Sequence, residues 1–149
     1  MRLSRRGWNN VLIFAVLSII FIANFSDKLT LSSNTEPRPI IDSQLTIVEI
    51  QTPDYQIKRF GRTWKSEPDL GISEAQLLSL VENWQHMPLE EQAPFDTPTN
   101  PYVIKVYTID KAQPIVVQLS QFGDDYLLQS DPSYSLLLHA KQLPLLLGR

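Results

Sequence analysis

The two histidines, His86 and His139, are the side chains best suited to acid–base chemistry near neutral pH. Such chemistry needs a second group that orients the imidazole, and a zinc site needs further ligands about one helical turn away. Neither histidine stands in an H-x-x-x-H or H-E-x-x-H pattern, and they lie far apart in the sequence. We therefore predict that neither is catalytic or binds a metal. A hydrolase with an unusual site at one of them is a weaker alternative.

Two pairs of acidic residues are the remaining candidates for cation binding. Asp124 and Asp125 follow Gly123, but a calcium loop of the EF-hand type needs alternating oxygen ligands and a closing glutamate, which are missing. We expect a solvated turn there and a solvated pair at Glu90 and Glu91. The chain has no cysteine and no nucleophile, phosphate-binding or dinucleotide-binding motif. The sequence predicts that the protein is not an enzyme, with no catalytic residue, metal site or cofactor.

An uncharged apolar run, VLIFAVLSIIFIA at residues 11–23, follows three arginines near the start of the chain. With its flanks, the segment 8–25 extends about 27 Å as a helix, close to the roughly 30 Å hydrocarbon core of a bilayer. We predict a transmembrane helix over 8–25, with the lipid bilayer as its partner, and a basic cytoplasmic tail over 1–7. Because positive charge favours the cytoplasmic side, the rest is expected outside. We therefore expect a single-pass protein of the inner (plasma) membrane whose carboxyl-terminal domain is periplasmic or extracytoplasmic.

A cleaved signal peptide is the competing interpretation of the same segment, because it also begins with basic residues before an apolar stretch. Cleavage requires small residues at the first and third positions before the cut. Ala23 is preceded at that spacing by Phe21, and Ser26 by Asn24, so neither position fits. A retained anchor is favoured, and a secreted soluble domain after cleavage is the alternative.

The sequence beyond the apolar segment divides into a tether over 26–42 and an exported domain over 43–149. The tether is polar and contains two prolines, which favour extended conformations. From residue 29 onward there are nine Lys and Arg against fifteen Asp and Glu, which argues against nucleic-acid binding. The nearest thing to a basic cluster spans Lys58 to Lys65, but Phe60, Gly61 and Trp64 interrupt it. We interpret it as a solvated strand face.

The first half of the exported domain predicts three antiparallel strands and a helix. The strands are expected over 45–50, 55–60 and 63–65, separated by turns at Thr52-Pro53-Asp54-Tyr55 and at Gly61. The helix begins after Ser73, where Gln76 completes a capping box, and ends near Met87 before Pro88. Its apolar stripe, which we expect to pack on the sheet, consists of Leu77, Leu80, Val81 and Trp84.

The second half predicts the same order after a crossing loop over 88–101. Strands are expected over 102–109, 115–119 and 126–129. Asp131 and Pro132 are typical of a helix start, and Tyr134, Leu137 and Leu138 would form the apolar patch of that helix. The predicted fold is α+β, with two antiparallel three-strand units each followed by a helix.

This order of elements, with Trp64, the Leu-rich capped helix, Tyr102 and Tyr126 in their places, resembles a known family. It is the uncharacterised α+β domain of bacterial envelope proteins that also appears in auxiliary proteins of gliding-associated transporters. The resemblance covers roughly residues 45–147. It implies a bacterial origin and an anchor formed by one amino-terminal helix, and it supplies no reaction and no catalytic residues. The chain is shorter than many such proteins and lacks a glycine-rich entry to the strand at Tyr126.

Two functions from different classes are consistent with the sequence. The first is a protein-interaction or assembly module that docks on another protein of an envelope complex. The second is a small-ligand or cell-wall-binding domain that uses exposed aromatic side chains. The aromatic candidates are Trp64, Tyr102, Tyr107 and Tyr126. Because each falls in a strand pattern, core packing is the simpler expectation for them.

Overall fold

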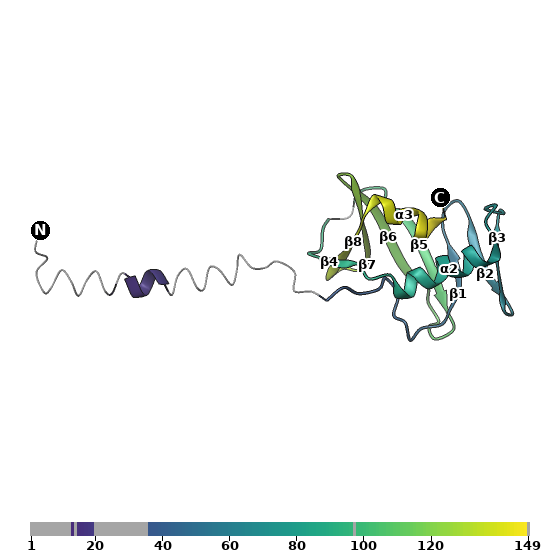
Figure 1. Cartoon of the computed structure of the whole chain (residues 1–149), viewed down its shortest axis with the longest axis horizontal. Helices are drawn as coiled ribbons and strands as arrows, with labels where there is room; N and C mark the ends of the chain where they lie inside the picture. The colour runs from purple at the N-terminus through teal and green to yellow at the C-terminus, as the bar shows by residue number, and fades with distance from the viewer. Residues whose placement is uncertain (1–12, 14, 20–35, 97, 149) are drawn as a thin grey trace, which may run out of the picture. The chain divides into compact units, whose positions relative to one another are not determined.

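The computed structural model describes residue 13 and residues 15–19, 36–96 and 98–148. The described part of the apolar segment, Ile13 and residues 15–19, is helical (purple in Figure 1). The predicted cytoplasmic tail, the rest of the predicted transmembrane helix and residues 26–35 of the predicted tether lie outside the described residues. No helix among the described residues is long and apolar enough to cross a bilayer. Residues from Thr35 to the end of the chain form a separate compact unit.

That unit contains one eight-stranded sheet in which every neighbouring pair is antiparallel, in the order β3-β2-β1-β5-β6-β7-β8-β4 (Figure 1). The strands are β1 Ile47–Gln51, β2 Gln56–Phe60, β3 Thr63–Glu67, β4 Glu90–Gln92, β5 Tyr102–Thr108, β6 Ile115–Phe122, β7 Asp125–Asp131 and β8 Tyr134–Leu138. The α+β class is confirmed.

The predicted division into two three-strand units is wrong, because β1 pairs with β5. Ile50 lies opposite Val106 in this ladder, and both side chains are buried. Each half of the sheet would otherwise leave a strand edge with unpaired N–H and C=O groups. Pairing between segments so far apart joins the halves into one continuous sheet with a single core.

The helix predicted to start at Asp131 and Pro132 is also wrong, because the residues from Tyr134 to Leu138 form strand β8. Asp131 and Tyr134 close a hairpin, and the Asp131 carboxylate accepts the Ser133 backbone N–H at 2.8 Å. An Asp-Pro pair favours turns as well as helix starts, and a short leucine run fits either period. This segment forms a strand because β8 pairs with both β7 and β4, which satisfies its backbone N–H and C=O groups on both sides.

The first helix of this unit, α2 Glu74–His86, agrees with its prediction. Ser73 caps it: its Oγ accepts the Gln76 backbone N–H at 3.3 Å, and the Gln76 side chain accepts the Ser73 N–H at 2.8 Å. The predicted stripe is buried against the sheet, and Trp84 has no exposed surface.

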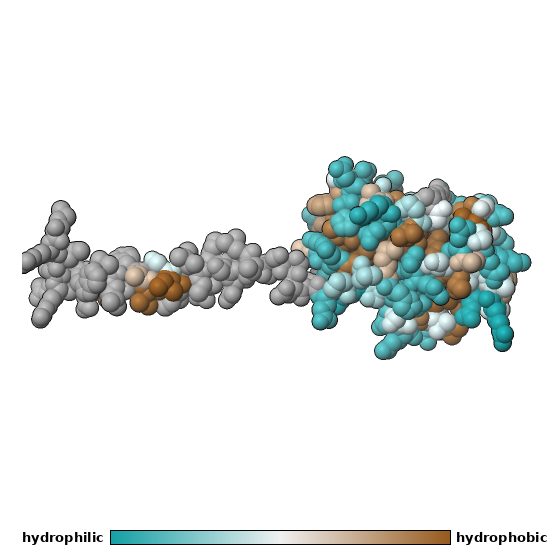
Figure 2. Space-filling model, in the orientation of Figure 1, coloured by the Kyte–Doolittle hydropathy of each residue, from teal (hydrophilic) through white to brown (hydrophobic). Residues whose placement is uncertain are grey.

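A short helix, α3 Leu143–Leu147, follows the 3-10 turn η1 Ala140–Gln142. Pro144 lies in the first turn of α3, where a missing backbone N–H costs little. In Figure 1, α2 and α3 lie on the same side of the sheet, and buried residues of both belong to its core. The hydrophobic residues visible in Figure 2 are scattered among hydrophilic ones.

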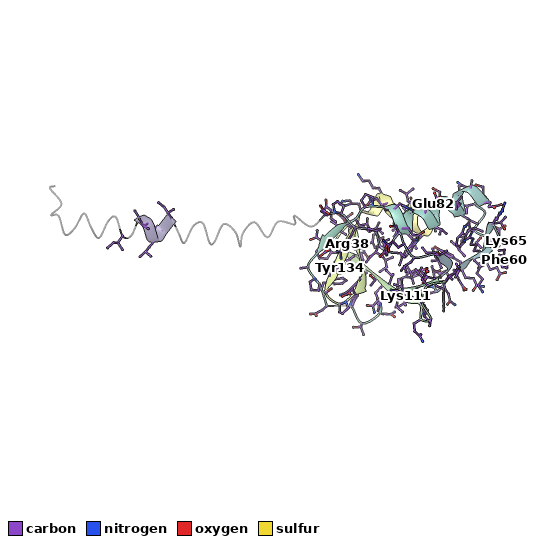
Figure 3. The ribbon with its side chains drawn as sticks, turned by 90° about the horizontal axis from the view of Figure 1, so that it is seen from below. Arg38, Phe60, Lys65, Glu82, Lys111 and Tyr134 are labelled. Atoms are coloured by element: carbon purple, nitrogen blue, oxygen red, sulfur yellow. The ribbon has the colours of Figure 1, made fainter. Side chains whose placement is uncertain are left out.

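The carboxyl-terminal end of the predicted tether belongs to the folded unit, so the domain does not begin at residue 43. Arg38 and Leu89 exchange backbone hydrogen bonds of 3.0 and 3.1 Å, and Ile41 is 1% exposed. The Arg38 guanidinium lies 4.8 Å from the centre of the Tyr134 ring, beside it in Figure 3, and 3.2 Å from Glu91. Glu91 is therefore paired, contrary to the predicted solvated pair, and lies in β4 within the predicted crossing loop.

Candidate binding pocket

One end of the sheet presents two tyrosines on the face that the helices cover. Tyr102 lies opposite Leu119 in the β5–β6 ladder, and Gln121 lies opposite Tyr126 in the β6–β7 ladder. Cross-strand partners share a face, and residues two apart along a strand do as well. All four side chains therefore project to the side of α3.

These residues line a cavity of about 540 Å³, which we call the tyrosine pocket. Its apolar surface comes from the two tyrosine rings with Leu119 of β6 and with Leu143 and Leu147 of α3. Its polar side chains include Asp54, Asn100 and Gln121, and Pro98 and Pro101 contribute from the loop before β5. A volume of roughly 300–1,000 Å³ with apolar walls and a few polar groups is typical of small-molecule sites.

The Asp54 carboxylate is placed by the turn between β1 and β2. Thr52 Oγ1 accepts the backbone N–H groups of Asp54 at 3.3 Å and of Tyr55 at 3.0 Å, which holds the turn closed. Tyr102 Oη then donates to Asp54 Oδ2 at 2.7 Å. This predicted turn thus positions the charged side chain of the pocket.

The wall formed by α3 is held in place through three successive backbone carbonyls. Asn83 Nδ2 donates to Leu145 O at 3.0 Å, and Trp84 Nε1 donates to Leu146 O at 3.1 Å. Tyr55 Oη donates to Leu147 O at 2.7 Å. The last carbonyls of a helix lack intrahelical partners, so these side chains satisfy groups that would otherwise need water. The wall is therefore formed before any ligand arrives.

The charge of the pocket limits what it can bind. Among its described lining residues there is no Lys, Arg or His, and Asp54 is the one ionisable carboxyl group. A phosphate or carboxylate ligand would meet the like charge of the Asp54 carboxylate. Tyrosine hydroxyls, amides and the carboxylate favour an uncharged ligand that carries hydroxyl or amide groups.

The structure brings together two of the four aromatic candidates from the sequence. Tyr102 and Tyr126 line the pocket, whereas Trp64 is 8% exposed and belongs to the core. Tyr107 adjoins the buried Val106 along β5 and so projects from the opposite face, where its Oη donates to a Gln51 side chain at 3.3 Å. Core packing explains Trp64, and Tyr102 and Tyr126 also pack against the core while they line the pocket.

Sequence reasoning missed most of the polar and helical lining residues. Asp54 had a local signal, since it follows a proline in a predicted turn. Asn100, Gln121, Leu143 and Leu147 had none, because they meet only when three distant segments fold together.

The two histidines lie in different surroundings. His86 is exposed, with Nδ1 3.1 Å from Glu82 O, which is a local contact at the end of α2. His139 Nδ1 lies 3.0 Å from Asp125 Oδ2, and the other oxygen of that carboxylate accepts the Ala140 N–H at 2.9 Å. The Ala140 hydrogen bond, followed by that of His139, lowers the pKa of Asp125. The Asp125 carboxylate therefore has hydrogen-bond partners within the domain, contrary to the solvated turn predicted for Asp124 and Asp125. Among the described residues, no group of three or more His, Asp or Glu could hold a metal ion.

Comparisons of the chain with protein-family models, with curated proteins and with solved structures find no match. The resemblance to the envelope-protein family stays a prediction.

Proposed function

We propose that this chain is a single-pass membrane protein whose extracytoplasmic domain binds a small uncharged ligand in the tyrosine pocket. The membrane placement is the one predicted for residues 8–25 from their apolarity and the arginines before them. The ligand-binding role is supported by one observation above all. Tyr102 and Tyr126, on different strands, face the same preformed cavity with polar side chains at its border.

The pocket chemistry favours a saccharide. A pyranose ring has apolar C–H faces that pack on aromatic rings, and hydroxyl groups around its edge that need donors and acceptors. Tyr102 and Tyr126 supply the rings, while the amides of Asn100 and Gln121 and the carboxylate of Asp54 supply the polar partners. A neutral N-acetylated sugar unit of a cell-wall glycan combines these properties and agrees with an extracytoplasmic location.

The interaction module in an envelope complex is the second candidate. The apolar side chains of Leu119, Leu143 and Leu147 favour it, because they could equally accept an uncharged aromatic or aliphatic side chain from a partner protein. In that case a short peptide segment, rather than a glycan, would occupy the tyrosine pocket.

The two candidates are separated by titrating the full-length chain in detergent with N-acetylglucosamine oligomers and with neutral aromatic peptides. Saccharide binding supports the first candidate, and binding of peptides alone supports the second. Tyr126→Ala is expected to weaken binding at least about tenfold by removing one ring of the pocket. Tyr107→Ala, a half-buried tyrosine on the opposite face, is the control and should change affinity by less than about twofold. If neither class binds, or if both variants weaken binding equally, the proposal fails.

A further inference from the structure

The hairpin formed by β2 and β3 concentrates positive charge in an otherwise acidic domain. Four cations fall between residues 58 and 65, and no acidic residue occurs from Tyr55 to Ser66. The four are Lys58, Arg59, Arg62 and Lys65. We call this hairpin, with Phe60 at its tip, the basic hairpin.

The strand register places two lysines and the phenylalanine together. Lys58 lies opposite Lys65, and Phe60 lies opposite Thr63, so these side chains share one face of the hairpin. The buried side chains of Ile57 and Trp64 occupy the other face, toward the core. Phe60 is 51% exposed, and Lys65 Nζ lies 5.7 Å from the centre of its ring. Figure 3 shows the two side by side at one end of the domain.

This arrangement costs folding stability, because like charges directly opposite on neighbouring strands repel each other. Lys58 has a compensating acid, Glu49, at 3.5 Å. Among the described residues, Arg62 and Lys65 form no ion pair, and Arg59 Nε donates to the Gly61 carbonyl at 3.0 Å. Arg62 and Lys65 are therefore exposed cations without an acidic partner in the described part of the chain, and Lys65 lies beside the exposed Phe60 ring.

We infer that the basic hairpin docks on an anionic phospholipid surface. Aromatic side chains partition into the headgroup region, and each Lys or Arg near an anionic bilayer contributes about 1 kcal/mol of attraction. The rest of the domain carries a net negative charge, so the basic hairpin is the part that such a surface attracts. Residues 26–35 reach at most about 36 Å, which keeps the domain at a high effective concentration near the bilayer. The docking rests on the proposed anchor but not on the tyrosine pocket.

The test uses the full-length chain in nanodiscs made with and without phosphatidylglycerol. Because the chain has no cysteine, Thr63→Cys provides a single labelling position in the basic hairpin for a spin label. Asp124→Cys, in the turn between β6 and β7, provides the control position. We expect the accessibility of the hairpin label to oxygen, relative to a water-soluble relaxation agent, to rise by about twofold or more in the anionic discs. About 0.5 M salt should reverse this rise, and the control label should not change.

Charge reversal at exposed positions separates docking from a general attraction. R62E/K65E should abolish the rise at the hairpin label, while the control K111E/K141E should preserve it. All four residues are exposed, so the fold should persist, which a thermal unfolding midpoint no lower than that of the unmodified chain checks. A hairpin label that stays in water in anionic discs would overturn the docking, even if the hairpin crosslinks to an acidic protein instead. A chain that does not enter discs of either kind would contradict the anchor as well.

Discussion

Tyr102 Oη donates a hydrogen bond to Asp54 Oδ2 over 2.7 Å, which joins the first residue of β5 to the turn between β1 and β2. The two residues come from the two halves of the sequence, and the pairing of β1 with β5 brings them together. The same pairing that makes one sheet therefore builds the polar side of the tyrosine pocket.

Removing this hydrogen bond should cost a modest amount of stability. Tyr102→Phe keeps the ring and is expected to lower the free energy of unfolding by about 1 kcal/mol, because the bond is at the surface. Tyr107→Phe removes a longer bond to Gln51 and should cost less than about half as much. Urea unfolding of the two variants measures the difference. Equal losses of unfolding free energy in the two variants would show that the hydrogen bond from Tyr102 to Asp54 stabilises the fold no more than the longer bond from Tyr107 does.

Trp84 should hold α3, and through it the wall of the pocket. Trp84→Phe leaves the Leu146 carbonyl without its donor and creates a small cavity, so we expect a loss of about 2–3 kcal/mol together with weaker ligand binding. Trp64→Phe is the control: it makes the same substitution at another core tryptophan, for which the structure gives no hydrogen bond between the indole and α3. Urea unfolding and ligand titration of both variants check this. The expectation fails if Trp64→Phe weakens ligand binding as much as Trp84→Phe does.

The Asp125 carboxylate should stabilise the fold in a pH-dependent way. The Ala140 N–H, and then His139, lower its pKa in the folded state below the ordinary value of 3.8. A group with a lowered folded pKa contributes stability above its unfolded pKa and loses it as the pH falls through the folded pKa. Asp125→Asn should therefore lower the unfolding midpoint near neutral pH, and the difference from the unmodified chain should shrink toward about pH 3.

The neighbouring residue provides the control for this pH dependence. Asp124 is exposed and follows Gly123 in the same turn, so Asp124→Asn should leave the midpoint nearly unchanged across the range. A difference for Asp125→Asn that stays constant with pH would contradict the role of the charged carboxylate.

The stretch before residue 43 should be needed for folding. Ile41 is 1% exposed, and its backbone N–H donates to Trp84 O at 3.0 Å. Ile41→Ala is expected to cost about 2–4 kcal/mol through the lost burial and the cavity that remains. Ile109→Ala, at a position that is 70% exposed, should change stability by less than about 0.5 kcal/mol. Thermal or urea unfolding that fails to separate the two would place Ile41 outside the core.

The elements that the sequence predicted correctly have local causes. Helix α2 carries its start signal at Ser73 and Gln76 and its packing face in the spacing of the following apolar residues. The turn at Gly61 needs a positive φ, which glycine adopts without a Cβ penalty. Such features depend on residues close together in the sequence, so they can be recognised without knowing which distant segments pack against them.

The elements that were missed depend on distant partners. The leucine run in β8 fits a helix or a strand, and only the ladders on both of its sides decide between them. Ile41 looked like part of a polar tether because its burial depends on α2. The tyrosine pocket combines the turn at Asp54, strands β5 to β7 and helix α3, so no sequence window contains its pattern.

The proposed function is tested most directly by following side-chain amide signals in NMR spectra of the full-length chain while an N-acetylglucosamine tetramer is added. Asn100 and Gln121 line the tyrosine pocket, whereas Gln118 alternates with buried neighbours on β6 and projects from the opposite face. Ligand binding in the tyrosine pocket predicts saturable shifts of the Asn100 and Gln121 amide signals with no change at Gln118. Two results would contradict ligand binding in the tyrosine pocket. One is that the Asn100 and Gln121 signals do not shift with saturating sugar or, in a second titration, with a neutral aromatic peptide; the other is that all three side chains shift equally.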